Sequence, residues 1–415
     1  MTLLDHRGRP RVAVTGLGVK TPAGIDIASF WSTVRAGRPT AAPIQRFDAS
    51  GLPVRFAGEV LDFDPVPYFG AKEARRNDRV TQLGFAAAAD ALADAGEVGA
   101  DPDRCAVVVG TGVGGLGTLE DQVKVFHDKG PLRVSPFFVP MMMANATAGV
   151  VAMQLGWTGP NICISTACAA GAHAIGEAVR LVRDGTADVV MAGGTEAAVT
   201  PVTISAFARM GALSTRNNEP ERASRPFDAE RDGFVIGEGA AFVVLESLEQ
   251  ARARGARVYG EVVGYGRNAD AYHITAPSPG GAGAAACMQL ALDDAGLEPS
   301  AIGHINAHGT STPLNDAAEA EAVRKAFGDD APPVTSTKGV TGHLIGAAGA
   351  AEALASLLSI NDGVVPPTAN LETLGDDIGV DVVAGAAREI GGQPVLSNSF
   401  GFGGHNAALV LAASE

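Results

Sequence analysis

The run CISTACAAGAH, residues 163–173, has the pattern of a strand that turns sharply into a helix. Cys168 falls at the start of that helix. Unpaired backbone N–H groups and the positive end of the helix dipole stabilise an anion there, so we expect the pKa of the Cys168 thiol to be lowered. Ala169, Ala170 and Gly171 leave room for a substrate carbonyl beside the sulfur. The run therefore indicates a covalent nucleophile, with a buried structural cysteine as the alternative.

Strand and helix patterns alternate on both sides of this run. In the first part of the chain the apolar patterns predict strands at 11–18, 105–110, 162–166 and 189–192 and helices at 27–36, 80–95 and 169–183. The pattern restarts near Tyr259, with strands at 259–265 and 302–308 and helices at 283–295, 315–327 and 343–360. We therefore predict an α/β protein built from two similar halves, residues 1–255 and 256–415.

The bulk composition limits the possible partners. The chain has 415 residues, 46% of them hydrophobic, which is enough for a large α/β core. Its formal net charge of −15 argues against nucleic acid as a general partner, because phosphate binding needs an excess of Lys and Arg. An anionic partner would have to bind at a local basic patch.

Cysteine usage and hydropathy point to a cytoplasmic protein. The four cysteines show neither CxxC spacing nor the density of a disulfide framework, and the polar first eleven residues lack a signal-peptide core. Residues 134–176 contain no Lys, Arg, Asp or Glu, but Pro and Gly interrupt them too often for a membrane helix. We interpret this segment as buried core together with a subunit interface.

Three further residues suggest a catalytic group around Cys168. His308 lies in NAHGTSTP, just after a predicted strand, and His343 lies in KGVTGHLIG, which also contains Lys338. The helix predicted to begin at His343 carries only one charge, Glu352, before residue 362, so it is buried on most sides and Glu352 needs a partner. Taken singly, the histidines could be structural, Lys338 solvated and Glu352 at the surface. Cysteine, two histidines and a lysine together favour catalysis.

These motifs resemble those of the β-ketoacyl-[acyl-carrier-protein] synthases, the synthase I/II branch of the condensing enzymes. The resemblance covers essentially the whole chain and is greatest to the synthase II type. It rests on four motifs in family order: TAC (166–168), HGTST (308–312), Lys338 with GHL (342–344), and NSFGFGG (398–404). It implies a thiolase-like fold, in which duplicated α/β halves form a five-layered αβαβα sandwich.

The resemblance also implies a reaction, the decarboxylative Claisen condensation of fatty acid elongation. Cys168 takes an acyl group as a thioester, and His308 and His343 hold the thioester carbonyl of malonyl-acyl carrier protein while it loses CO2. Two imidazole donors would stabilise the resulting enolate more than the ground state. Backbone N–H groups of Cys168 and Phe402 would form the oxyanion hole, each such donor being worth about 3 to 4 kcal/mol of barrier.

The family pattern assigns roles to further residues. Lys338 orders the histidines and pairs with an acid that maps to Glu319. The substrate site includes two hydroxyls for the phosphopantetheine arm, a gate and three positions near the acyl chain: Thr310 and Thr312, Phe402, and Val113, Phe207 and Phe400. For Val113 and Phe207, simple core packing is an equal alternative. No metal and no separate cofactor are implied, because the acyl and malonyl thioesters are carried on the phosphopantetheine of acyl carrier protein.

Two protein partners follow from the same resemblance. Lys72, Arg75 and Arg76 match positions that dock the acidic carrier protein, and with Arg79 they form a basic cluster in an acidic chain, although such a cluster can also be an ordinary solvated helix face. Where a relative has a further docking arginine, this chain has Gly211. Condensing enzymes of this type pair through the half that carries the nucleophile, so we expect a homodimer.

Three alternatives stay open at this point. The run GTGVGG, residues 110–115, fits GxGxxG and suggests a nicotinamide-dependent dehydrogenase, but no acidic residue ends a second strand about 20 residues later. The non-catalytic chain-length subunit of a polyketide synthase would lack a nucleophilic cysteine, and Cys168 is present. A ketosynthase of a specialised type II polyketide pathway would use the same chemistry as fatty acid elongation.

Overall fold

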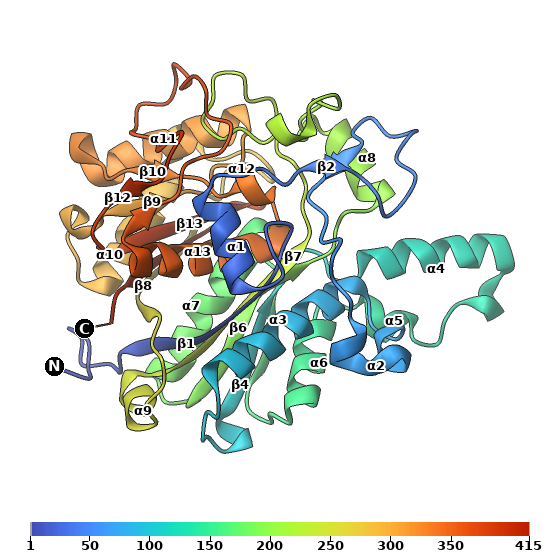
Figure 1. The fold of residues 1–415 in the computed structure, drawn as a ribbon, viewed down its shortest axis with the longest axis horizontal. Coiled ribbons are helices and arrows are strands. Elements are labelled where there is room, and N and C mark those ends of the chain that lie inside the picture. Colours follow the sequence, from blue (N-terminus) through green and yellow to red (C-terminus); the bar gives the residue numbers. More distant parts are fainter. Residues whose placement is uncertain (1, 415) are drawn as a thin grey trace.

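The computed structural model describes residues 2–414, in which ten strands form one mixed sheet (Figure 1). The strands of the first half are β1 (Val12–Lys20), β4 (Cys105–Gly110), β5 (Asn161–Ile164), β6 (Val189–Glu196) and β7 (Gly239–Ser247). Those of the second half are β8 (Gly260–Ala269), β9 (His304–Asn306), β10 (Val334–Thr335), β13 (Val395–Gly401) and β14 (His405–Ala412). Two small ribbons pair β2 (Ala42–Pro43) with β3 (Phe56–Ala57) and β11 (Val364–Val365) with β12 (Arg388–Glu389).

The sheet order confirms the predicted duplication. Its order is β10-β9-β13-β14-β8-β1-β7-β6-β4-β5, so each half runs from its outer edge inward as third, second, fourth, fifth and first strand. The halves meet where β1 pairs with β8 over only two positions, Ala13 opposite Glu261 and Val14 opposite Gly260. Such a short join lets each half act as a sheet of its own.

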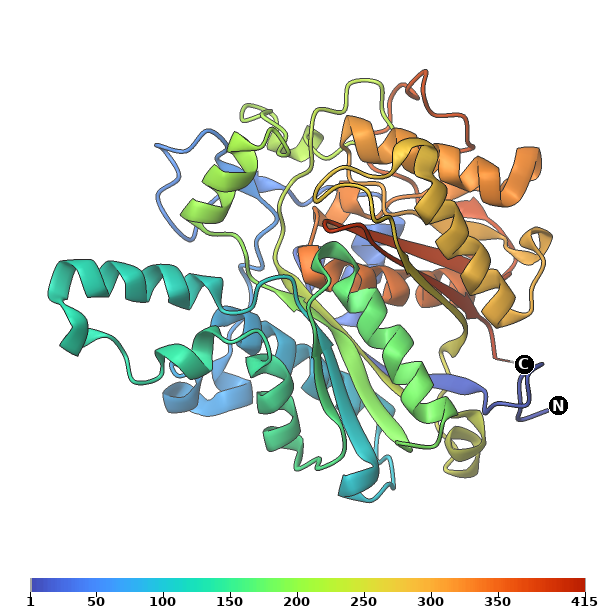
Figure 2. The same ribbon diagram turned by 180° about the vertical axis from the view of Figure 1, so that it is seen from behind.

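Helices cover both faces of each half, which gives five layers (Figures 1 and 2). α7 (Ala170–Arg183) and α13 (Ala348–Asp362) pack together between the two halves. α3 (Arg79–Ala95) and α6 (Ala146–Leu155) cover the outer face of the first half, and α10 (Ala282–Ala295) and α11 (Pro313–Phe327) lie on the outer side of the second. The thiolase-like αβαβα arrangement expected from the sequence is therefore present.

Residue alternation along the strands builds the layers. On β6, Val190 and Ala192 face the central helices, whereas Val189 and Met191 face α3 and α6. The predicted apolar stripe of α7 at Ala172, Ile175, Val179 and Val182 is buried in the central core. All residues of α13 from 348 to 360 are buried, as the near absence of charge predicted.

The remaining helices lie around these layers, and part of them forms an arm. They are α1 (Ile27–Arg35), α2 (Val66–Ala74), α4 (Leu116–Lys129), α5 (Phe138–Met142), α8 (Pro201–Arg209), α9 (Leu248–Ala253) and α12 (Lys338–Thr341). α4 and α5 project from the body as an arm (Figures 1 and 2). In the described part of the chain, no helix is long and apolar enough to cross a bilayer.

One structural prediction was wrong in part. His343 does not begin the long helix, because α12 ends at Thr341 and α13 begins at Ala348, with His343 in the turn between them. The uncharged segment 134–176, expected to combine buried core with a subunit interface, has parts of both kinds in the single chain: Val151 lies in the core, whereas Val139 is 58% and Met153 80% exposed. An absence of charge marks apolar surface as readily as it marks a core.

Candidate active site

A strained turn places Cys168 at the start of α7. β5 ends at Ile164, and Ala167 takes a φ of +50°, a region that residues other than glycine rarely adopt. The short 3-10 turn Ala167–Ala169 then leads into α7, so the predicted position of Cys168 at a helix N-terminus is confirmed. Gly401 packs closely on this turn, since a Cβ there would lie 2.7 Å from the Thr166 carbonyl oxygen. The sulfur is thereby held in a buried but reachable position.

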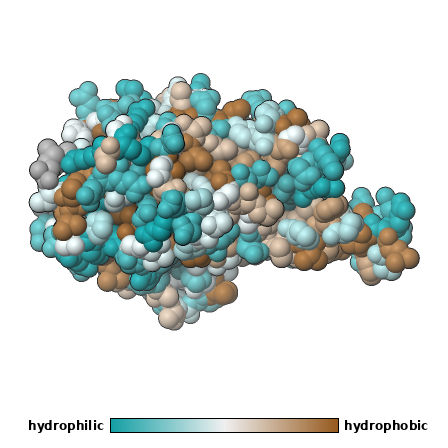
Figure 3. Space-filling view, turned by 90° about the horizontal axis from the view of Figure 1, so that it is seen from below, coloured by the Kyte–Doolittle hydropathy of each residue, from teal (hydrophilic) through white to brown (hydrophobic). Residues whose placement is uncertain are grey.

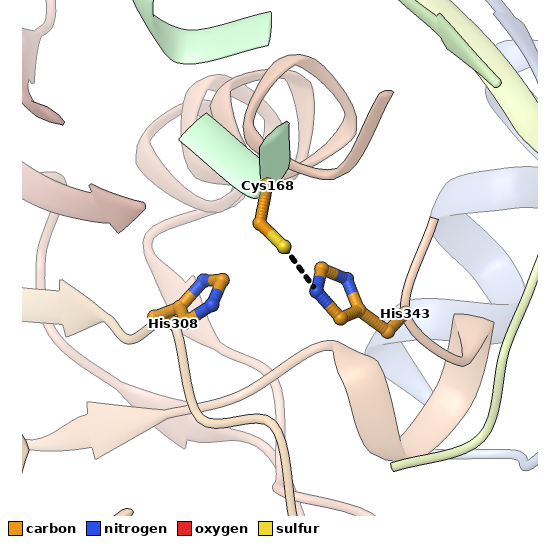
Figure 4. Close-up of side chains that lie close together, drawn as sticks. All are labelled: Cys168, His308 and His343. Atoms are coloured by element: carbon orange, nitrogen blue, oxygen red, sulfur yellow. Dashed lines mark hydrogen bonds between the residues drawn. The ribbon is translucent and has the colours of Figure 1, made fainter. Parts of the chain in front are cut away.

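The second half brings both predicted histidines to the sulfur. His308 follows β9, and the imidazole Nε2 of His343 lies 3.0 Å from Cys168 Sγ (Figure 4). The two imidazole rings stand almost perpendicular, with centroids 5.4 Å apart. One ligand-type atom from each of the three residues lies within 4.8 Å of the other two. His308 and His343, which follow Cys168 by 140 and 175 positions in the sequence, thus meet it where the halves face each other.

Hydrogen bonds set the tautomers of both imidazoles. The backbone N–H of Ile345 donates to His343 Nδ1 over 3.3 Å, and the Lys338 ammonium, a donor only, lies 3.3 Å from His308 Nδ1. Each Nδ1 therefore accepts, and each Nε2 carries the proton. Both rings present N–H donors to the space beside Cys168.

The same hydrogen bonds bear on whether these three residues suit an oxyanion or a metal ion. Cys168, His308 and His343 are close enough to ligate one ion. A metal-ligating imidazole, however, binds through a lone pair and donates its other N–H to a neighbouring acceptor. Here the neighbours of both Nδ1 atoms, the Ile345 amide and Lys338, are donors. The donor set therefore favours a developing negative charge over a metal.

The expectation of a lowered Cys168 pKa was wrong. Burial raises the pKa of Cys168 to about 11, although the positive charge of Lys338 and the backbone N–H groups of Phe402 and Cys168 act in the opposite direction. Cys168 does lie at a helix N-terminus, which lowers the pKa of its thiol, but the loss of hydration on burial raises that pKa by more. Burial also lowers the pKa of His308 and His343 well below the usual value, with help from Lys338. The resting site therefore holds a thiol and two neutral imidazoles.

The predicted partner of Lys338 was also wrong. Its ammonium hydrogen-bonds Glu352 of α13 and the carbonyl oxygen of His308, the latter over 2.5 Å. Both Lys338 and Glu352 are buried, which excludes the solvated and surface alternatives. Glu319 instead accepts the backbone N–H groups of His308 and Gly309 over 2.8 and 2.7 Å. Glu319 thus holds the His308 backbone, and Glu352 holds Lys338.

A cavity of about 480 Å³ opens beside the three residues. The positions that the sequence assigned to substrate all line it: Val113, Phe207, Thr310, Thr312, Phe400 and Phe402. Thr310 and Thr312 hydroxyl oxygens lie 2.9 Å apart, and the Phe400 ring packs 5.9 Å from His308. The cavity therefore joins an apolar lining to hydroxyl groups and to Cys168, His308 and His343.

The GxGxxG alternative does not fit the structure. The loop after β4 contains Gly112, whose N–H donates to the carboxylate of Glu196 over 2.6 Å. A Cβ on Gly112 would lie 2.7 Å from that carboxylate. In a dinucleotide site these N–H groups would bind a pyrophosphate. An internal carboxylate already occupies the anion position, so the loop is not a phosphate cradle.

Comparison with known proteins agrees with this geometry. The family model "Beta-ketoacyl synthase, N-terminal domain" matches residues 9–251, more than half of the chain, and "Beta-ketoacyl synthase, C-terminal domain" matches residues 259–372. The chain belongs to the β-ketoacyl synthase family. The family prediction from the four sequence motifs is thereby confirmed.

Curated relatives and solved structures place this β-ketoacyl synthase more closely. It is 50% identical to the 3-oxoacyl-[acyl-carrier-protein] synthase 2 of Synechocystis sp. over 97% of this chain and 98% of the relative. It is 46% identical to the synthase 2 of Staphylococcus aureus over 98% and 99% of the two chains. The ishigamide ketosynthase/chain length factor superposes with a TM-score of 0.91 at 37% identity, covering 98% of this chain and 100% of that one.

The basic cluster is smaller than the sequence suggested. Lys72 and Arg75 are exposed at the end of α2, and Arg76 is half-buried, with its guanidinium 4.7 Å from the centre of the Phe137 ring. Arg79 instead turns inward and pairs with the buried carboxylate of Glu238. Arg76 also pairs with Glu73 over 2.8 Å, so a partner can reach Lys72 and Arg75 fully and Arg76 in part.

Sequence reasoning missed two residues beside the site. Phe234 packs edge-on against His343, with ring centroids 5.3 Å apart, and lines the cavity. Glu196 ends β6, is fully buried, and binds the loop at Gly112. An apolar Phe234 gives no catalytic signal. Glu196 did give a signal, which was overlooked: it is the single acid in the otherwise uncharged run 189–199, and a buried acid needs a partner.

Proposed function

We propose that this β-ketoacyl synthase is a 3-oxoacyl-[acyl-carrier-protein] synthase that elongates fatty acids. The proposal is supported above all by the meeting of Cys168, His308 and His343 within 4.8 Å at an apolar-lined cavity. The synthase 2 names of relatives that match almost the whole chain at 45–50% identity support the same substrate class.

The first step is acyl transfer to Cys168. The sulfur attacks the thioester carbonyl of acyl-carrier protein, the C–S bond to phosphopantetheine breaks, and the cysteine proton passes to the departing thiolate. N–H groups of Cys168 and Phe402, which already face Sγ, stabilise the tetrahedral oxyanion. Because burial raises the pKa of Cys168 to about 11, the thiolate forms only as these donors and His343 Nε2–H compensate its charge.

The second and third steps use the imidazoles. The malonyl thioester carbonyl accepts the Nε2–H groups of His308 and His343, and loss of CO2 leaves an enolate whose charge they stabilise. The enolate carbon attacks the acyl-Cys168 carbonyl, and the C–S bond to Cys168 breaks. The products are 3-oxoacyl-carrier protein, CO2 and the Cys168 thiolate, which takes a proton from water to become the thiol again. Lys338 and Glu352 hold His308 and touch no reacting atom.

The reaction can be tested with purified components. An acyl-carrier protein and malonyl-carrier protein should give 3-oxoacyl-carrier protein and CO2 in equal amounts, followed by mass spectrometry of the carrier and by release of labelled CO2. One condensation per carrier fits fatty acid elongation. Repeated condensation to a polyketone would favour a polyketide ketosynthase, the second candidate, which the similar solved structure of a type II PKS acyl-carrier protein in complex with its ketosynthase supports. CO2 release without a new C–C bond would contradict both.

Lys72, Arg75 and Arg76 form the proposed docking site for acyl carrier protein. A similar structure, a type II polyketide ketosynthase, is described in complex with its acyl-carrier protein. Changing Arg75 to Glu should raise the KM for acyl-carrier protein about 10-fold at low salt, because a local positive charge steers an acidic partner. The effect should shrink above about 0.3 M salt. Arg257→Glu, at an exposed arginine just before β8 and outside both α2 and the arm, is the matched control; an equal effect there would contradict docking at α2.

A homodimer is proposed from the apolar surface of the first half. β5 pairs only with β4, so its other edge is open, and Ile162 on it is 38% exposed. Hydrophobic residues also follow the projecting arm (Figure 3), where Leu132 is 96% exposed. Light scattering should give twice the 42.0 kDa mass of the chain at micromolar concentration. A monomer would contradict the dimer.

The free thiols of all four cysteines suit a reducing cytoplasm.

A further inference from the structure

Glu196 is a buried carboxylate held only by neutral donors. It lies at the end of β6, has no exposed surface, and accepts the N–H of Gly112 over 2.6 Å and the N–H of Gly346 over 3.1 Å. The Thr111 hydroxyl donates to its other oxygen over 3.1 Å. Within residues 2–414, no Lys, Arg or His forms a salt bridge with it. Burying a carboxylate without a positively charged partner costs free energy of folding, so we expect the contacts that Glu196 makes to serve a structural or functional purpose.

Each amide that Glu196 binds belongs to a loop of the active site. Gly112 and Val113 line the cavity. Gly346 follows Ile345, whose N–H sets the tautomer of His343. The two loops touch, since a Cβ on Gly346 would lie 2.4 Å from the nitrogen of Gly112. One carboxylate therefore joins the cavity wall to the loop that orients a catalytic imidazole.

The loop at Ile345 is strained and needs such a hold. Ile345 has a φ of +49°, a left-handed conformation that is unfavourable for a β-branched residue. Conformations of this kind persist where the surroundings over-determine them. The bond from Gly346 to Glu196 fixes the peptide that follows Ile345. Relaxing it would let the Ile345 N–H turn away from His343 Nδ1.

We propose that Glu196 is a positioning residue that couples the wall of the acyl cavity to the orientation of His343. The proposal rests on the proposed condensing activity, in which His343 stabilises the enolate. Glu196 touches no reacting atom. Its task is to hold the amides of Gly112 and Gly346 at one point, so that His343 keeps its Nε2–H directed at the substrate carbonyl.

Two conservative variants separate the effect of the length of the Glu196 side chain from the effect of its negative charge. Glu196→Gln keeps the length of the side chain and an oxygen that can accept both amides. A neutral group is tolerated here, because burial raises the pKa of Glu196 to about 7. Glu196→Asp keeps the charge but is about 1.5 Å shorter, one C–C bond, so it cannot reach both amides. The titratable groups that feel this charge are the thiols of Cys163 and Cys168.

The experiment compares these variants of the full chain with Glu246→Asp. Glu246 is an equally buried glutamate on β7, bonded to Thr15 and Arg254 and away from the cavity. Glu196→Asp should lower kcat for malonyl-carrier protein decarboxylation by about 10-fold or more, with KM within about 3-fold of wild type, as expected for a misplaced donor. Glu196→Gln should recover to within about 5-fold. Hydrogen exchange in segments 111–114 and 343–348 should be faster in Glu196→Asp alone.

Two results would overturn the proposal. One is a Glu196→Asp protein with the kcat and the exchange rates of Glu246→Asp. The other is a Glu196→Gln protein as impaired as Glu196→Asp, which would make charge, not reach, the important property. If the wild-type protein decarboxylates nothing, the proposed function fails, and the exchange rates still decide whether Glu196 holds the two loops.

Discussion

Replacing Cys168 with Ala abolishes condensation while malonyl-carrier protein still loses CO2. We expect this separation because the sulfur is needed only to carry the acyl group, whereas the enolate is stabilised by His308 and His343 (Figure 4). Loss of a covalent nucleophile costs on the order of 10⁴-fold or more in turnover. The measurement is the rate of 3-oxoacyl-carrier protein formation beside the rate of CO2 release.

A matched control shows whether loss of condensation could come from removing any buried thiol. Cys287 is also a buried free thiol, but it lies on the core-facing side of α10 and does not line the cavity. Cys287→Ala should therefore condense at close to the wild-type rate. Condensation by Cys168→Ala above a few per cent of wild type would refute the covalent role of the sulfur.

Replacing His308 with Ala should impair decarboxylation and spare acyl transfer to Cys168, the opposite of the result expected for Cys168→Ala. Decarboxylation should fall by about 10² to 10³-fold, because one preorganised donor to the enolate oxygen is lost. Transfer of the acyl group to Cys168 should persist, since the imidazole bonded to Sγ is that of His343. The loss of decarboxylation should appear in kcat more than in KM, because the donor acts on charge that develops in the transition state.

His304→Ala is the control for His308→Ala. His304 is a buried histidine that begins β9, four residues before His308, and it lies outside the cavity. Its removal should lower stability, as a buried side chain is lost, but leave the decarboxylation rate per folded molecule near wild type. Equal decarboxylation rates in the His308 and His304 variants would exclude His308 from enolate stabilisation.

Local patterns predicted most of the fold and the central residues of the site. The strand at 105–110 has the predicted bounds, and the apolar stripe of α7 is buried as expected. Cys168, His308 and His343 were each singled out by short motifs at the ends of predicted elements. Such motifs are local, because backbone turns and the approach of small residues are set within a few positions of the chain.

Properties that depend on distant packing were not predictable in this way. Which acid meets Lys338 is decided by how α11 and α13 sit around the ammonium, and sequence order does not reveal that it is Glu352 and not Glu319. The prediction of a lowered Cys168 pKa was wrong for the same reason. A helix terminus can be recognised from eleven residues, but the burial that outweighs it comes from both halves of the molecule.

The central claim is that Cys168 carries the acyl chain and delivers it to an enolate held by two imidazoles. Intact-protein mass spectrometry tests it most directly, with acyl-carrier protein added first and malonyl-carrier protein second. We predict that the acyl mass appears on a peptide containing Cys168 and disappears as 3-oxoacyl-carrier protein forms. Product formation with no acyl mass on Cys168, or an acyl mass that malonyl-carrier protein fails to discharge, would contradict the account.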